Sequence, residues 1–75
     1  MNLSELNKDQ KGVITNVLAS SALKKRLFSL GVGINKHVTV LETSLQKNTI
    51  KIAIGQSALA LRFDEAALIE VKVDA

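Results

Sequence analysis

The chain is 75 residues long, which predicts a single domain spanning residues 1–75. It has no cysteine, tryptophan or tyrosine and one histidine, a composition that excludes disulfides and a cysteine-based zinc site and disfavours an aromatic surface for stacking nucleotide bases. The net charge of +3 would suit a nucleic-acid-binding protein, but acidic and basic residues are interspersed along much of the chain, and the excess would equally serve solubility.

The N-terminal segment MNLSELNKDQKG has no apolar core, so the sequence predicts no signal peptide. No apolar run approaches the roughly 18 residues that a membrane-spanning helix needs. The absence of cysteine fits a reducing compartment. We therefore expect a cytoplasmic protein whose fold rests on aliphatic packing.

The first part of the chain predicts a turn followed by a strand. After the opening LSEL, the polar segment NKDQKG is expected to form a turn that ends at Gly12. Residues 13–19, VITNVLA, are rich in β-branched side chains and are followed by two serines, which indicates a strand. Either Ser20 or Ser21 can cap a following helix through its hydroxyl.

A short helix is predicted over residues 22–30. Three leucines at helical spacing predict an apolar stripe that packs against the rest of the protein: Leu23, Leu27 and Leu30. Gly31 is suited to end the helix, because glycine enters the left-handed conformation without steric cost. Three basic residues are expected on the other side of the helix: Lys24, Lys25 and Arg26. Phe28 also lies off the leucine stripe.

The remainder of the chain predicts four more strands by alternation or by β-branched content: residues 37–43, 50–54, 58–61 and 69–73. Residues 44–48 and 55–57 are expected to form turns, and residues 63–68, FDEAAL, a single helical turn. Strands joined by two or three residues must be antiparallel. The sequence therefore predicts a mainly β fold, a small SH3-like or OB-like barrel of about five antiparallel strands with one short α-helix inserted after the first strand.

The sequence shows no catalytic or cofactor-binding pattern. The glycines of GVGIN end a helix, so the negative end of the helix dipole faces them, and this disfavours a phosphate-binding loop. His37 has no cysteine or carboxylate pair near it in the sequence, which disfavours nucleophilic catalysis. Asp64 and Glu65 point in different directions on a helical turn and are expected to favour its start. We therefore expect no catalytic residue, no cofactor and no metal site.

Phe28 suggests a binding surface. A phenylalanine among basic residues exposes apolar area unless a partner or another part of the protein covers it. In one interpretation the rim of the barrel covers Phe28, which then belongs to the core. In the other, three apolar residues framed by three basic residues form a protein-binding patch: Phe28, Val32 and Ile34, with Lys24, Lys25 and Arg26.

The chain resembles the FeoA family, the small cytoplasmic components of bacterial ferrous-iron transport. The segments that carry the resemblance are LSEL with Gly12, LKKRLFSLGVGINKHVTV, and ALALRFDEAALIEV. The middle segment is similar to a basic-Arg-Leu-x-x-Leu-Gly pattern, and the last to a Leu-Arg-x-x-Glu-Ala-x-x-Ile-x-Val ending. No single motif is specific, but their order and spacing are typical of FeoA-like domains, which include the C-terminal SH3-like domains of metal-dependent repressors.

Two turns depart from the family pattern. Ile34-Asn35 stands where the family usually has Pro-Gly, and Asn48-Thr49 stands where it usually has Asp-Pro. Asparagine tolerates the left-handed conformation that the family's glycine would take, so we expect the first turn to form.

The resemblance implies an SH3-like barrel without catalytic activity that acts on the membrane permease FeoB, at its cytosolic GTP-binding portion. The helix and turn after the first strand would be the family's distinctive feature. We expect the partner to contact six residues: Lys24, Lys25, Arg26, Phe28, Val32 and Ile34. Arg62 is expected to be structural, and an exposed apolar patch would also permit a homo-oligomer.

Two alternatives stay open. One is a stand-alone domain of the metal-dependent repressor type, which would need His37 to approach acidic residues such as Glu42, Asp64 or Glu65 in space. The other is a small nucleic-acid-binding barrel, which predicts a steeply salt-dependent affinity for RNA or DNA.

Overall fold

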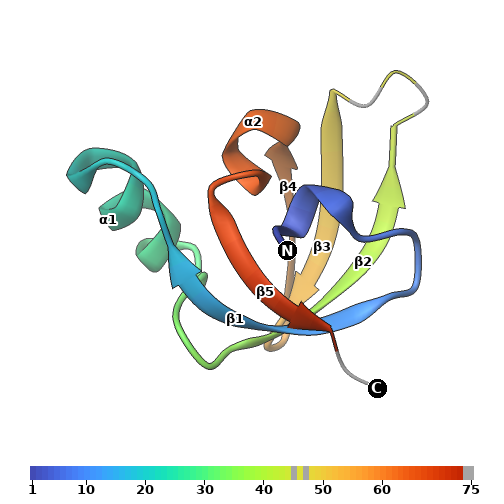
Figure 1. The fold of residues 1–75 in the computed structure, drawn as a ribbon, viewed down its shortest axis with the longest axis horizontal. Helices are drawn as coiled ribbons and strands as arrows, with labels where there is room; N and C mark the ends of the chain where they lie inside the picture. Colours follow the sequence, from blue (N-terminus) through green and yellow to red (C-terminus); the bar gives the residue numbers. More distant parts are fainter. Residues whose placement is uncertain (45, 47, 74–75) are drawn as a thin grey trace.

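The computed structural model describes residues 1–44, 46 and 48–73. These residues form five strands, two α-helices and one 3-10 helix (Figure 1). In chain order the elements are η1 (Leu3–Glu5), β1 (Lys11–Val17), α1 (Ser21–Ser29), β2 (His37–Thr43), β3 (Thr49–Ile54), β4 (Ser57–Arg62), α2 (Phe63–Ala66) and β5 (Ile69–Val73). The strands predicted over residues 37–43 and 69–73 are confirmed with those bounds, and β3 and β4 extend slightly beyond their predicted ranges.

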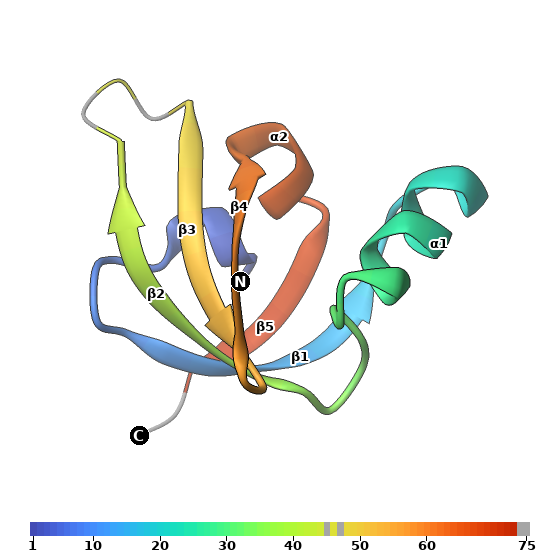
Figure 2. The same cartoon turned by 180° about the vertical axis from the view of Figure 1, so that it is seen from behind.

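The five strands form one antiparallel sheet in the order β4-β3-β2-β1-β5. The sheet is strongly curved, and α2 and η1 lie together at one end of the barrel that it forms (Figures 1 and 2). The register shifts once between β1 and β5 and once between β2 and β3, and such bulges bend a strand and increase its twist. The mainly β barrel with a short helix after its first strand is therefore confirmed.

The core is aliphatic, as the composition predicts. Alternate residues of the strands turn inward, and η1 and α1 each add a fully buried leucine, Leu3 and Leu27. The buried apolar residues are Leu3, Leu6, Ile14, Val17, Leu27, Val32, Val38, Val40, Ile50, Ile52, Ile54, Leu61, Ala66, Ile69 and Val71. No polar or charged residue is buried among the described residues. Packing of branched side chains therefore holds the barrel together.

The helix α1 is capped by Ser20, whose hydroxyl accepts the N–H of Leu23 at 3.4 Å, so the predicted capping is confirmed. Leu27 is buried and Leu23 is half-buried, but the prediction that Leu30 packs against the protein is wrong, because Leu30 is 42% exposed. Leu30 is the residue that caps the C-terminus of the helix, and Gly31 follows with a φ of 96°. The chain leaves the helical path there, so helical spacing no longer sets the direction of a side chain.

The strand β1 begins earlier than predicted. Gly12, expected at the end of a turn, lies inside β1 and pairs with Val38 of β2 and Val73 of β5. A Cβ at Gly12 would lie 3.1 Å from the carbonyl oxygen of Lys72, so the missing side chain permits this close approach of the strands. The glycine that resembled a turn residue therefore serves strand packing.

Three other predictions concern turns and helices. Asn35 has a φ of 69° and donates its N–H to the carbonyl of Ile14 at 2.8 Å, so the turn expected to tolerate asparagine does form. The turn predicted over residues 44–48 includes residues 45 and 47, which lie outside the described residues. The helical turn predicted over residues 63–68 is confirmed as the shorter α2.

No described helix has the length and apolar character needed to cross a membrane.

Candidate protein-binding surface

The helix α1 projects from the side of the barrel (Figures 1 and 2). Leu27 anchors it in the core, and Leu23 packs partly against the core. Phe28 and Ile34 are each 50% exposed. Large apolar side chains that remain exposed close together mark interaction sites, so this region is the candidate surface. Leu30 is a further exposed apolar residue that the sequence predicted to be buried.

Phe28 and Ile34 belong to one open hollow. Its lining is completed by Gly31, Val32, Gly33 and Lys36. The ring of Phe28 lies against Gly33, where an added Cβ would be 3.2 Å from the Cε1 atom of the ring. Gly33 is itself buried. Phe28 is therefore held in position on one side by backbone and is exposed on the other, so it is not a core residue.

Val32 is fully buried, so the prediction that its side chain is exposed in the apolar patch beside Phe28 and Ile34 is wrong. The N–H of Val32 donates to the carbonyl of Leu27 at 2.9 Å, and the N–H of Gly31 donates to that of Phe28 at 3.0 Å. These two bonds are the Schellman arrangement that ends a helix, in which the residue after the glycine packs against the residue five positions earlier. Val32 and Leu27 are accordingly both buried in the core cluster.

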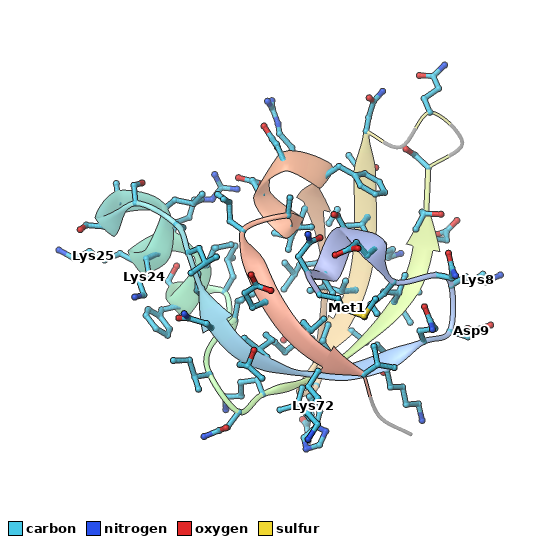
Figure 3. The ribbon with its side chains drawn as sticks, in the orientation of Figure 1. Met1, Lys8, Asp9, Lys24, Lys25 and Lys72 are labelled. Carbon is cyan, nitrogen blue, oxygen red and sulfur yellow. The ribbon has the colours of Figure 1, made fainter. Side chains whose placement is uncertain are left out.

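The part of the sequence that contains α1 carries positive charge without acidic residues. Residues 10–41 contain five Lys or Arg and no Asp or Glu, whereas the rest of the chain contains five basic and seven acidic residues. Lys24 and Lys25 lie on α1, far from Lys8 and Lys72 (Figure 3). Within the described residues, neither Lys24 nor Lys25 forms an ion pair. We call Lys24, Lys25, Phe28 and Ile34 the α1 surface.

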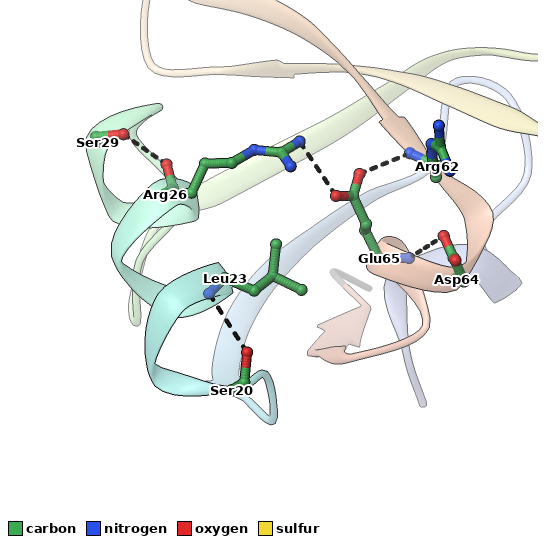
Figure 4. Close-up of polar contacts among 7 residues, drawn as sticks. All are labelled: Ser20, Leu23, Arg26, Ser29, Arg62, Asp64 and Glu65. Atoms are coloured by element: carbon green, nitrogen blue, oxygen red, sulfur yellow. Dashed lines mark hydrogen bonds and ion pairs between the residues drawn. The ribbon is translucent and has the colours of Figure 1, made fainter.

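Arg26 has a different role from the two lysines. Its Nη2 atom lies 3.1 Å from the Oε2 atom of Glu65 in α2 (Figure 4). The Oε1 atom of Glu65 accepts the N–H of Arg62 at 3.1 Å, which caps the start of α2. Arg26 therefore joins α1 to the barrel, and its charge is largely compensated. Arg62 ends β4 and exposes its side chain.

The sequence contains a signal for one half of this arrangement. Glu65 stands three residues after Arg62, the spacing at which a glutamate reaches back to the N–H of the residue that begins a helix. The pairing of Glu65 with Arg26 joins residues 39 positions apart, and no local pattern in the sequence predicts it. Asp64 is exposed and accepts the N–H of Glu65 at 2.9 Å.

The described residues contain no group of three or more His, Cys, Asp or Glu side chains that is placed to hold a metal ion. His37 is exposed at the start of β2, Glu42 lies near the end of that strand, and Asp64 and Glu65 belong to α2. The ligand set that a repressor-type metal site would need is therefore not found in this part of the chain.

Comparison with known proteins places the fold and the family. A family model described as the FeoA domain matches residues 1–73. A Campylobacter jejuni protein described as an Fe(2+) transport protein A is 41% identical over 73 residues, which are 97% of this chain and 99% of that protein. The solution structure of FeoA from Chlorobium tepidum matches 100% of this chain and 71% of its own, with a TM-score of 0.94 and 31% identity.

Two further structures bear on the architecture. FeoA of Stenotrophomonas maltophilia, a prokaryotic SH3 domain protein solved with zinc, matches 96% of this chain and 89% of its own, with a TM-score of 0.78 and 26% identity. A manganese-dependent transcriptional repressor matches 97% of this chain and 41% of its own with a TM-score of 0.89, and at 19% identity that likeness concerns the fold alone. The expected SH3-like barrel is confirmed, and the match over residues 1–73 shows that this chain belongs to the FeoA domain family.

Proposed function

We propose that this protein is a non-enzymatic, cytoplasmic accessory protein of ferrous-iron uptake, and that it acts by binding the cytosolic GTP-binding portion of a FeoB-type transporter through the α1 surface. The relatives that are described as Fe(2+) transport proteins motivate the transport role. The description of the Stenotrophomonas maltophilia protein as a candidate activating factor for ferrous iron transport motivates action on a transporter.

The observation that carries the proposed contact is the combination of apolar exposure and unpaired positive charge on α1. Phe28 and Ile34 offer apolar area, and Lys24 and Lys25 lie beside Phe28 on α1 without a described acidic partner. A surface of this kind fits an acidic, partly apolar region of another protein, because opposite charges speed the encounter and apolar contacts hold the complex. Arg26 would hold α1 in position through its ion pair with Glu65 and would contribute less to partner binding than Lys24 and Lys25 do.

The test is a nuclear magnetic resonance titration of isotope-labelled protein with the cytosolic GTP-binding portion of the transporter, with and without guanine nucleotide. We expect shifts that cluster on residues 24–34 in at least one nucleotide state. Shifts that cluster elsewhere would reject the α1 surface as the contact. An absence of shifts in every nucleotide state would reject binding to this portion of the transporter.

The acid-free stretch 10–41 also suits a nucleic-acid-binding barrel, which is the second candidate function. The scarcity of aromatic residues opposes it, because small barrels that bind single strands usually stack bases on exposed rings. A titration with RNA and DNA at low salt distinguishes the two functions. Binding that weakens steeply as salt rises would favour this candidate, and no binding even at low salt would eliminate it.

A further inference from the structure

The strand β4 is an edge of the sheet and pairs with β3 alone. Natural proteins usually protect such an edge with charged residues, proline or a bulge, because unpaired backbone groups invite another strand. β4 has none of these protections over residues 57–61, SALAL, and its register with β3 runs without a shift. Ala58 and Ala60 are exposed.

The hydrogen-bond register identifies which backbone groups of β4 face outward. In an antiparallel pair, residues alternate between bonding to the neighbouring strand and facing away from it. Phe63 donates its N–H to Asn48 at 3.1 Å, so every second residue back from Phe63 faces β3. The residues between them face outward, and Arg62 accordingly donates its N–H to Glu65. Ala58 and Ala60 therefore direct their N–H and C=O groups to the open edge.

The opposite edge of the sheet differs. The outer side of β5 is covered by the start of the chain, where Asn2 bridges to Glu70 and Val71 donates its N–H to the carbonyl of Met1 at 2.9 Å. β5 also carries Glu70 and Lys72. One edge is thus covered and charged, while residues 57–61 of the other edge are unpaired on their outer side and carry no charge.

The open part of β4 is short and symmetric. It is bounded at one end by the two-residue turn Gly55-Gln56 and at the other by Arg62, whose N–H is already bonded to Glu65. Within it, Ala58 and Ala60 flank Leu59 at equal distances along the strand. A two-fold axis at Leu59 would place Ala58 of one copy opposite Ala60 of the other, so that all four outward groups of each copy find a partner.

We propose that β4 is a self-association edge, at which two copies of this chain pair antiparallel around Leu59 and join their sheets. The small side chains of Ala58 and Ala60 permit close approach, and in this register Arg62 lies opposite Gln56 of the second copy, so no like charges meet. Leu59, which is half-buried, would meet its equivalent across the axis. This edge lies outside the α1 surface, so the pairing does not depend on transporter binding.

The size of the contact sets its strength. Stable interfaces bury about 1,200 Å² or more in total, and pairing over a three-residue stretch buries much less. We therefore expect a reversible dimer that becomes populated at about millimolar protein concentration. Hydrogen exchange of individual amides at low and high concentration is the direct test. The Ala58 and Ala60 amides should exchange quickly in dilute protein and about two- to threefold more slowly at 2 mM protein, where a dimer with a dissociation constant of about 1 mM holds roughly 60% of the chains. Leu59 and Leu61, already bonded to β3, should exchange at rates that do not depend on concentration.

Substitutions of opposite charge supply the second test, by sedimentation over about 0.05 to 2 mM protein. Ala58→Lys with Ala60→Lys should abolish the association, because each lysine would face a lysine of the second copy, and the same is expected of the double glutamate variant. An equimolar mixture of the two variants should restore it. Ala67→Lys, at an exposed position after α2, is a control for positive charge added away from β4 and should associate as the parent does.

A charge introduced at position 60 would lie opposite Lys51 of the same chain and could change the stability of the fold. The thermal stability of each variant is therefore measured first. Because a dimer with a dissociation constant of about 1 mM is populated at 2 mM protein, a parent protein that stays monomeric at that concentration would overturn the proposal. So would an association that survives both lysines, or one that disappears with Phe28→Asp but not with the β4 substitutions. The exchange experiment uses the unaltered protein and remains decisive if a variant fails to fold.

Discussion

A single carboxylate, that of Glu65, joins Arg26 of α1 at 3.1 Å and the backbone N–H of Arg62 at 3.1 Å. The side chain of Glu65 is 13% exposed and that of Arg26 is 58% exposed, so the pair lies at the boundary between barrel and solvent. Because α1 reaches the core mainly through Leu27 and Leu23, this carboxylate is its principal polar attachment to the barrel.

The two contacts of Glu65 can be separated by substitution. Glu65→Ala removes both, and we expect it to lower the free energy of unfolding by about 1–2 kcal/mol. Glu65→Gln keeps an oxygen that can accept the N–H of Arg62 but removes the charge that holds Arg26, so we expect a loss of about 0.5–1 kcal/mol. Denaturant unfolding followed by circular dichroism measures both, since the chain has no tryptophan or tyrosine.

The control for this prediction is a double-mutant cycle with Arg26→Gln. We expect a coupling of about 0.5 kcal/mol between the two positions, decreasing as salt is added, because the pair is partly exposed. Equal destabilisation by the alanine and glutamine variants of Glu65 would show that the cap of α2 contributes nothing.

Phe28 and its neighbour Leu27 should respond very differently to substitution. Leu27 is fully buried, so Leu27→Ala is expected to lower the free energy of unfolding by about 2–5 kcal/mol. Phe28 is 50% exposed, so Phe28→Asp is expected to lower it by about 1 kcal/mol or less, through lost contact with Gly33. Thermal unfolding of both variants checks this. Severe unfolding by Phe28→Asp would mean that Phe28 belongs to the core and not to the α1 surface.

The strands were predictable because their burial follows a simple period. Ile50, Ile52 and Ile54 alternate with less buried residues, and all three lie in the core. The extent of β1 was less predictable, because Gly12 resembles a turn residue unless its neighbours across the sheet are known. The backbone carbonyl of Lys72 lies so close to Gly12 that a side chain there would crowd it, and Lys72 is 60 positions away in the sequence.

The end of α1 shows where helical spacing stops being informative. Helical spacing predicts that Leu30 is buried, and its position beside the helix suggests that Val32 is exposed. Gly31 turns the chain away from the helix, and the structure has Leu30 exposed and Val32 buried. A leucine, a glycine four residues later and then a valine form a signature of the Schellman ending, which would have predicted the burial of Val32. The ion pair between Arg26 and Glu65 forms only because the fold brings α1 beside α2. The sequence alone therefore predicts the same contact role for Arg26 as for Lys24 and Lys25.

Gly31 is expected to be sensitive for a conformational reason only. A Cβ at this position would have nothing within 4 Å, yet the φ of 96° is one that L side chains rarely adopt. We expect Gly31→Ala to lower the free energy of unfolding by about 1–2 kcal/mol. Gly31→Asn should lower it by less, because asparagine tolerates positive φ better. Equal losses in the two variants, measured by denaturant unfolding, would mean that the reversal of the chain at Gly31 is not the cause.

Charge reversal on α1 separates specific docking from general electrostatic attraction. Lys24→Glu with Lys25→Glu should weaken transporter binding about tenfold and reduce its dependence on salt, because these lysines have no described acidic partner in the protein. Lys8→Glu with Lys72→Glu is the matched control, since it makes the same change in net charge at exposed positions far from α1 (Figure 3). Titration calorimetry at two salt concentrations measures both pairs. An equal loss of affinity in the two would show that net charge, and not the α1 surface, attracts the partner.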